Sequence, residues 1–144
     1  MRIFIGCDHA GFHMKDSLKT FLQQNVESEL LDLGAFSEES VDYPDVAREV
    51  AGKVNENPGA FGILICGTGI GMCMAANKQK GIRAVDATSE HMAEMSRKHN
   101  NANVLCLGGR ELQPEMAQQI TKIFLTTAFE AEERHLRRIE KMEQ

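Results

Sequence analysis

The residues best suited to chemistry lie in the segment 65–71, Ile65-Cys66-Gly67-Thr68-Gly69-Ile70-Gly71, directly after a strongly apolar run. Glycines in alternate positions let the backbone approach a ligand closely and point N–H groups at an anion. A thiol placed before such a turn and the start of a helix is favoured in its thiolate form. Cys66 is therefore a candidate base or nucleophile, although a tight turn after a buried cysteine would show the same pattern.

A second pair of chemically able residues follows the first apolar run of the chain. Asp8 and His9 stand there, and histidine titrates near neutral pH, so the pair can take and give protons. Aspartate is also a preferred residue at the start of a helix. Helix capping is the simpler interpretation of this pair when it is considered alone.

Two further polar groups lie in the second half of the chain. His99 and Asn100 end a predicted helix and could bind sugar hydroxyls, although both also suit a helix C-terminus. Arg134 and Arg138 are four residues apart and share a helical face, and Arg110 follows a Gly-Gly turn. Guanidinium groups suit bidentate binding of phosphate. A solvated helix with salt bridges to neighbouring glutamates is the alternative.

The elements that must position these residues alternate between strand and helix. Apolar runs predict strands over 2–7, 30–33, 61–66, 82–85 and 104–107. Helical spacing predicts helices over 11–25, 43–56, 70–78, 89–98, 114–125 and 129–142. Such alternation indicates an α/β fold with a parallel sheet between two helical layers.

We therefore predict one domain over residues 1–144 with a Rossmann-like, flavodoxin-like architecture and the strand order 2-1-3-4-5. In that order the winding reverses between strands one and three, and ligands bind at the carboxyl ends of strands at such a reversal. The two strand ends that meet there carry Asp8-His9 and Cys66-Gly67. Topology and residue chemistry therefore predict the same site.

Composition narrows the function classes. The chain has 144 residues, a net charge of −5 and 42% hydrophobic residues, so a general nucleic-acid or membrane-binding surface is not expected. The N-terminal apolar run is too short for a signal peptide, which favours the cytoplasm. The four cysteines form no Cys-x-x-Cys pair and fit neither a zinc site nor a disulfide framework. We expect free thiols and no metal.

Six segments in combination resemble the type B ribose-5-phosphate isomerase family, which also includes the galactose-6-phosphate isomerase subunits. They are Gly6–Phe12, Asp42-Tyr43-Pro44, the segment 65–71, Ala75–Lys78 with Gly81–Ala84, Arg97–Asn100, and Arg134 with Arg138. The resemblance implies an aldose–ketose isomerase of the pentose phosphate pathway, without metal or cofactor, that interconverts D-ribose 5-phosphate and D-ribulose 5-phosphate through an enediolate. It also implies a homodimer, or a tetramer of such dimers, with each active site built from both subunits.

The resemblance assigns the proton transfer to the segment 65–71. Cys66 would be the base that moves a proton between C2 and C1, with Thr68 assisting. The backbone amides of Gly67, Gly69 and Gly71 would stabilise the enediolate oxygens. One branch of the family uses a glutamate directly after the last glycine instead, but this chain has Met72 there. It is therefore similar to the branch with a cysteine base.

The same resemblance assigns ring opening and substrate binding to residues elsewhere in the chain. Asp8 and His99 would open the furanose ring, with Asn100 nearby. The groups that would hold the phosphate are His9, Arg110, Arg134 and Arg138. Tyr43 would line the pocket.

Three other functions remain open from the sequence. The first is a hexose-6-phosphate isomerase that acts on allose or galactose 6-phosphate. The second is a flavodoxin-like module that binds a nucleotide or flavin, and the third is a thiol redox protein that uses Cys66. Roles of Cys7, Cys73 and Cys106 beyond packing are also undetermined.

Overall fold

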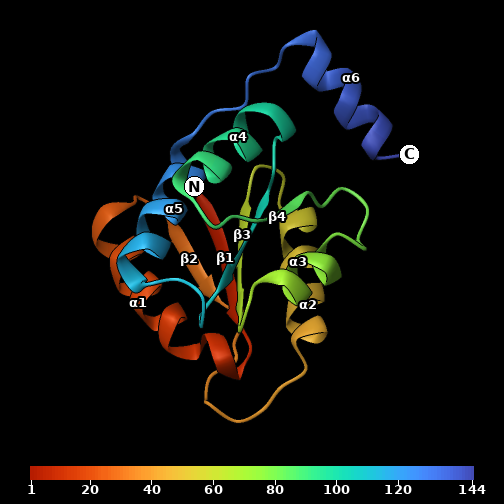
Figure 1. The fold of residues 1–144 in the computed structure, drawn as a ribbon. Coiled ribbons are helices and arrows are strands. Elements are labelled where there is room, and N and C mark those ends of the chain that lie inside the picture. The colour runs from red at the N-terminus through yellow and green to blue at the C-terminus, as the bar shows by residue number, and fades with distance from the viewer.

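Five short apolar runs form one parallel β-sheet in the computed structural model, which describes residues 1–144 (Figure 1). The strands are β1 (Arg2–Cys7), β2 (Glu29–Asp32), β3 (Phe61–Cys66), β4 (Ala84–Asp86) and β5 (Val104–Gly108). Strands β1, β3 and β5 are buried along almost their whole length. Burial on both faces explains why their sequences are continuous apolar runs without alternation.

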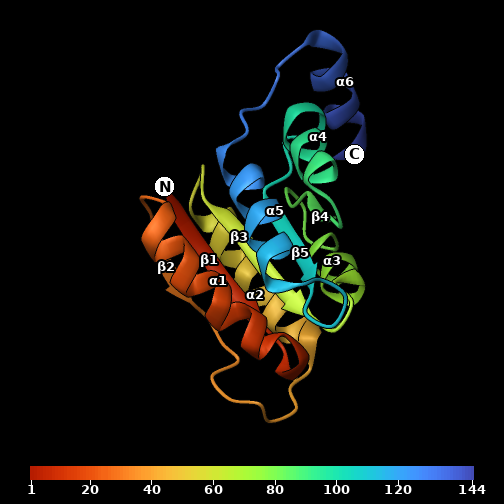
Figure 2. The ribbon, with the colours of Figure 1, turned by 60° about the vertical axis from the view of Figure 1, so that its left-hand side comes forward.

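Helices cover both faces of the sheet (Figure 2). They are η1 (His9–Gly11), α1 (Phe12–Asn25), α2 (Tyr43–Glu56), α3 (Ile70–Ala76), α4 (Glu90–Asn100), α5 (Pro114–Thr126) and α6 (Glu133–Met142). Helix α5 packs against both α1 and α4 on one face, and α2 packs against α3 on the other. Each face of the sheet has its own hydrophobic core. Along β1, Ile3 and Ile5 point into the core on the side of α1 and α5, while Phe4 points into the core on the side of α2 and α3. No helix is both long and apolar enough to span a membrane.

The order of the strands is β2-β1-β3-β5-β4, so the predicted order is wrong for the last two strands. Strand β5 has five buried residues and occupies the interior, whereas the three half-buried residues of β4 suit an edge. The chain therefore moves outward from β3 to β4 and returns to β5. A right-handed crossover on the return places α4 on the face that carries α1 and α5.

This order matters for the site because it brings the end of β5 beside the end of β3. The N–H of Gly109 donates to the carbonyl oxygen of Cys66 at 2.7 Å, and the N–H of Arg110 donates to that of Gly67 at 3.0 Å. Strands β1 and β3 are neighbours, as predicted, so the winding reversal lies between them. Three strand ends, not two, therefore meet at the candidate site.

Most boundaries agree with the predictions, and the differences have local causes. Helix α3 ends at Ala76, whereas the prediction extended it to residue 78. The helix stops there because the Asn77 side chain pairs with the backbone of Ala84: its Nδ2 donates to the Ala84 carbonyl oxygen at 2.9 Å, and its Oδ1 accepts from the Ala84 N–H at 2.8 Å. Helix α6 begins at Glu133 and not at 129, since the N–H of Glu130 donates to the carbonyl oxygen of Lys98 at 3.0 Å. Strand β4 lies one to two residues later than predicted.

Candidate active site

The turn after β3 brings a backbone amide to the sulfur of Cys66. Cys66 is the last residue of β3 and only 4% exposed. Gly69 has φ of +85°, a conformation that favours glycine, and its N–H donates to Cys66 Sγ at 3.2 Å. The N–H of Ile70 donates to Thr68 Oγ1 at 3.3 Å, and Thr68 is exposed at the mouth of the turn. The sulfur and the predicted amide cradle are therefore adjacent.

Asp8 and His9 lie beside this turn at the end of β1. Asp8 caps η1, because its Oδ1 accepts hydrogen bonds from the N–H groups of Ala10 at 2.9 Å and Gly11 at 3.2 Å. Its own N–H donates to the Ile65 carbonyl oxygen at 3.0 Å, which ties it to β3. His9 Nδ1 is buried and has no hydrogen-bond partner. Such unpaired atoms are uncommon in folded proteins, so this nitrogen lacks the hydrogen-bond partner that a buried imidazole normally has.

Tyr43 and Arg110 border the same turn. A methyl group added at Gly71 would lie 2.8 Å from Cε2 and Cζ of Tyr43, so the phenol ring rests directly on the start of α3. A methyl group added at Gly67 would lie 3.5 Å from Arg110 Nη1. The structure thus brings a thiol, a phenol, a guanidinium and an unpaired imidazole nitrogen around one glycine-rich turn.

The remaining predicted residues lie at the opposite end of the sheet. His99 and Asn100 are the last residues of α4, which leads to the amino end of β5, and Arg134 and Arg138 are on α6, which packs against α4. Figure 1 shows α6 beyond the amino ends of the strands, whereas the turn after β3 lies at their carboxyl ends. Within a single chain, the predicted site residues therefore lie in two groups at opposite ends of the sheet.

On α6 the two arginines differ in their surroundings. Arg134 Nε donates to Glu132 Oε2 at 2.7 Å, so the salt-bridge interpretation holds in part for this residue. Arg138 forms no hydrogen bond or ion pair and is exposed. Arg138 is therefore free to bind an anion.

His135 is a residue that sequence reasoning missed. Its ring stacks on that of His99 with centroids 4.5 Å apart and planes 14° from parallel. It is 3% exposed, and its Nε2 is buried without a hydrogen-bond partner. Burial, together with the nearby His99, lowers the pKa of His135 and so favours its neutral form. The side chain therefore fixes the plane of the His99 ring, and no sequence signal beyond the helical spacing pointed to it.

Glu130 joins His99 and His135 in the one set of donor groups close enough to hold a metal ion. One ligand atom from each lies within 4.8 Å of the others. Lys98 Nζ already pairs with Glu130 Oε1 at 3.4 Å. A cation would therefore have to displace this ammonium group.

The other cysteines separate into packing residues and one accessible thiol. Burial raises the pKa of Cys7 to about 11 and that of Cys106 well above its usual value, so both remain protonated. A hydrogen bond with Cys106 lowers the pKa of Cys73, which is partly exposed. All four cysteines are free thiols. Met72, at the position of the alternative glutamate base, is fully buried in the core between α2 and α3.

Asp86, at the end of β4, is a second residue that no sequence motif singled out. Its Oδ1 is buried without a hydrogen-bond partner, and a methyl group added at Gly69 would collide with this oxygen. Burial raises the pKa of the Asp86 carboxyl group. The Asp86 carboxyl group therefore packs against the glycine turn at Gly69. Asp86 also lines a cavity of about 520 Å³ together with Ile70 and Cys73.

A family model, a curated relative and two solved structures all relate this chain to sugar-phosphate isomerases. The family model for ribose/galactose isomerase matches residues 3–142. Ribose-5-phosphate isomerase B of Escherichia coli is 42% identical over 139 residues, covering 96% of this chain and 92% of the relative. The crystal structure of a ribose 5-phosphate isomerase from Thermotoga maritima superposes with a TM-score of 0.94 at 46% identity and covers 99% of this chain and 97% of that one. A ribose-5-phosphate isomerase B from Mycoplasma genitalium, solved with bound ribulose-5-phosphate, superposes with a TM-score of 0.92 at 44% identity, covering 99% and 93%.

Proposed function

The chain belongs to the ribose/galactose isomerase family, and on this premise we propose that it interconverts D-ribose 5-phosphate and D-ribulose 5-phosphate. The observation that carries the proposal is the sulfur of Cys66 held in a turn whose Gly69 amide faces it at 3.2 Å. Ribulose-5-phosphate bound to the Mycoplasma genitalium relative favours a pentose phosphate over the hexose phosphates. The reaction belongs to the pentose phosphate pathway.

The proposed chemistry needs one base and one place for negative charge. The Cys66 thiolate removes the C2 proton of the open-chain aldose, and the electron pair moves through C1 to the carbonyl oxygen. Backbone amides of Gly67, Gly69 and Gly71 stabilise the resulting enediolate. The thiol then returns the proton to C1 while the proton on O2 passes to O1, so that O1 becomes a hydroxyl group and O2 becomes the carbonyl oxygen. No oxidant, reductant or cofactor is consumed. Thr68, exposed in the same turn, assists in moving the hydroxyl protons.

Substrate binding requires both groups of residues that the fold separates. His9, Arg110 and Tyr43 lie with Cys66, while His99, Asn100, Arg134 and Arg138 lie at the other end of the sheet. A closed two-fold dimer can bring the α4–α6 end of one chain to the Cys66 turn of its partner. We therefore propose a homodimer, alone or within a tetramer, whose two active sites are shared. Asp8 and His99 from different subunits would then open the furanose ring, and the arginines would hold the phosphate.

A reducing location fits this assignment. The proposed base is a thiol, and all four cysteines are free, which is typical of the cytoplasm. We therefore propose a cytoplasmic location for the enzyme.

The direct test is turnover of ribose 5-phosphate by the purified protein in EDTA, compared with Cys66→Ala. Activity in the wild type that disappears in the variant supports the reaction and the base together. Allose 6-phosphate and galactose 6-phosphate are assayed in parallel. Turnover of a hexose phosphate without turnover of the pentose would replace the proposal with the hexose alternative. Turnover that survives in Cys66→Ala would remove the base assignment.

A further inference from the structure

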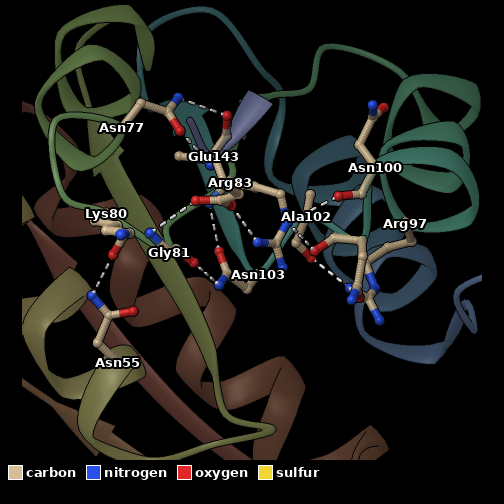
Figure 3. A network of polar contacts seen from close by, with 12 residues as sticks. Asn55, Asn77, Lys80, Gly81, Arg83, Arg97, Asn100, Ala102, Asn103 and Glu143 are labelled. Carbon is tan, nitrogen blue, oxygen red and sulfur yellow. Dashed lines mark hydrogen bonds and ion pairs between the residues drawn. The ribbon is translucent and has the colours of Figure 1, made fainter. Parts of the chain in front are cut away.

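The segment Gly81-Ile82-Arg83-Ala84 takes no part in the proposed chemistry, yet Arg83 lies at the centre of a polar network (Figure 3). Its Nε donates to the carbonyl oxygens of Asn100 at 3.0 Å and Asn101 at 3.1 Å. Its Nη1 donates to Glu143 Oε1 at 2.6 Å. A single guanidinium therefore joins the end of α4 to the end of α6.

Glu143 receives a second hydrogen bond at this junction. Its Oε2 accepts from the N–H of Gly81 at 3.2 Å. The Arg83 side chain is 18% exposed and that of Glu143 is 27% exposed, so solvent screens this pair less than an ordinary surface pair. Glu143 directly follows the last turn of α6, which makes this contact a fastening for that end of the helix.

The backbone that carries Arg83 is itself fixed. Its N–H donates to Asn103 Oδ1 at 2.8 Å, and Asn103 Nδ2 donates to the Gly81 carbonyl oxygen at 2.8 Å. Asn55, on α2, donates to the Lys80 carbonyl oxygen at 3.1 Å. Arg83 therefore projects from a segment anchored to the body of the protein, as Figure 3 shows.

Helix α6 depends on this fastening because its other attachments lie near its start. Lys98 pairs with Glu130 at 3.4 Å before the helix begins, and His135 stacks on His99 in its first turn. Arg134 and Arg138 lie between the two fastened ends. The contacts to Arg83 and Gly81 are both made by the Glu143 carboxylate, so Glu143 carries the side-chain attachment of this end of the helix.

We propose that Arg83 is a positioning residue for the phosphate-binding half of the active site. It holds the last turn of α4, with His99 and Asn100, and the end of α6, with Arg134 and Arg138, in one fixed arrangement. A helix ordered before binding avoids the entropic cost of ordering its arginines around the phosphate. The inference rests on the proposed function, because it assigns Arg83 to the same site.

The first test compares Glu143→Gln with Glu140→Gln. Both changes remove one negative charge from the α6 region, but Glu140 takes part in no ion pair or hydrogen bond. We expect Glu143→Gln to raise KM for ribose 5-phosphate roughly fivefold and to leave kcat unchanged, a size common for coupling through a contact network. Glu140→Gln should match the wild type in both parameters.

The second test uses Arg83 itself. Arg83→Gln removes the charge and should raise KM at least as much as Glu143→Gln. Arg83→Lys keeps the positive charge that faces Glu143 but lacks the guanidinium group that also reaches two carbonyl oxygens. The KM of Arg83→Lys should therefore lie between those of the wild type and Arg83→Gln. If Arg83→Gln fails to fold, Glu143→Gln with its control still decides the proposal.

Amide hydrogen exchange of residues 133–142, measured without substrate, separates this proposal from the proposed function. We expect faster exchange in Glu143→Gln than in Glu140→Gln and the wild type. If the wild type does not turn over ribose 5-phosphate, the proposed function fails while the exchange result still reports on the fastening. Unchanged exchange, or faster exchange with an unchanged KM in an active enzyme, would overturn the positioning role.

Discussion

The backbone N–H of Gly69 donates a hydrogen bond to the sulfur of Cys66 at 3.2 Å, within a single turn between β3 and α3. An N–H donor stabilises a thiolate more than a neutral thiol, because the charge-assisted hydrogen bond is the stronger one. In the proposed mechanism, the same turn would hold the Cys66 base before the reaction and stabilise the enediolate during it. The positive φ of Gly69 makes this geometry possible.

Cys66→Ser is expected to lower kcat by roughly 10²- to 10⁴-fold, the usual contribution of a positioned base, with little change in KM. A serine hydroxyl is a far weaker acid than a thiol, so the variant holds almost no anionic base at neutral pH. Steady-state kinetics with ribose 5-phosphate measures both parameters. Cys73→Ser is the matched control, because Cys73 is the more exposed thiol and lies outside the turn. A kcat near that of the wild type in Cys66→Ser would remove the base assignment.

Gly69→Ala and Gly59→Ala form a matched pair, since both glycines have φ of +85°. A methyl group at Gly59 meets nothing within 4 Å. Gly59→Ala should therefore lower the free energy of unfolding by only about 1–2 kcal/mol, the cost of placing a side chain on a residue in the left-handed conformation. At Gly69 the methyl group also collides with Asp86, which adds about 1–3 kcal/mol or displaces the turn. Chemical denaturation and kcat measure the two effects. Equal stability and equal kcat in the two variants would show that the turn tolerates the displacement.

Asp86→Asn is expected to stabilise the protein at neutral pH and to flatten part of its pH profile. Burial raises the pKa of Asp86 from 3.8, so the folded protein binds this proton more tightly than the unfolded chain does. The stability it contributes is therefore complete below pH 3.8 and is lost as pH rises through the raised pKa. Thermal unfolding from pH 3 to pH 8 should show this decline in the wild type and a smaller one in Asp86→Asn. Asp16→Asn, an exposed change on α1, should keep the wild-type profile.

Mixing two variants that each lose one proposed site residue tests the shared site. Cys66→Ser removes the proposed base, and Arg138→Ala removes a proposed phosphate contact near the opposite end of the sheet. If each site takes one residue from each subunit, a mixed dimer has one intact site and one doubly altered site. After unfolding and refolding of an equal mixture, half of the dimers are mixed, and we expect activity to recover to about 25% of the wild type. Recovery no greater than the average of the two variants would place each site within a single chain.

Local residue patterns were sufficient for much of the fold. The apolar runs 2–7 and 61–66 predicted β1 and β3, and the prediction for α2 matches Tyr43–Glu56 at both ends. The helix predicted over 89–98 starts where expected, because Ser89 caps α4 and its Oγ accepts from the N–H of Met92 at 3.2 Å. These features depend on neighbouring residues, which is why spacing and turn chemistry predict them. The turn around Cys66 belongs to the same group.

The sequence by itself therefore determined the α/β class, the glycine-rich turn and the family motifs, since each depends on residues adjacent in the chain. Only the tertiary structure decided that β5 lies between β3 and β4, because a strand's place depends on how much of it the rest of the sheet can bury. It also placed Arg110 beside Gly67 and separated His99 and Arg138 from Cys66. Asp86, His135 and Arg83 likewise gained significance only in three dimensions. Their unpaired atoms and long-range hydrogen bonds arise between segments that the chain keeps far apart, and no local pattern encodes such contacts.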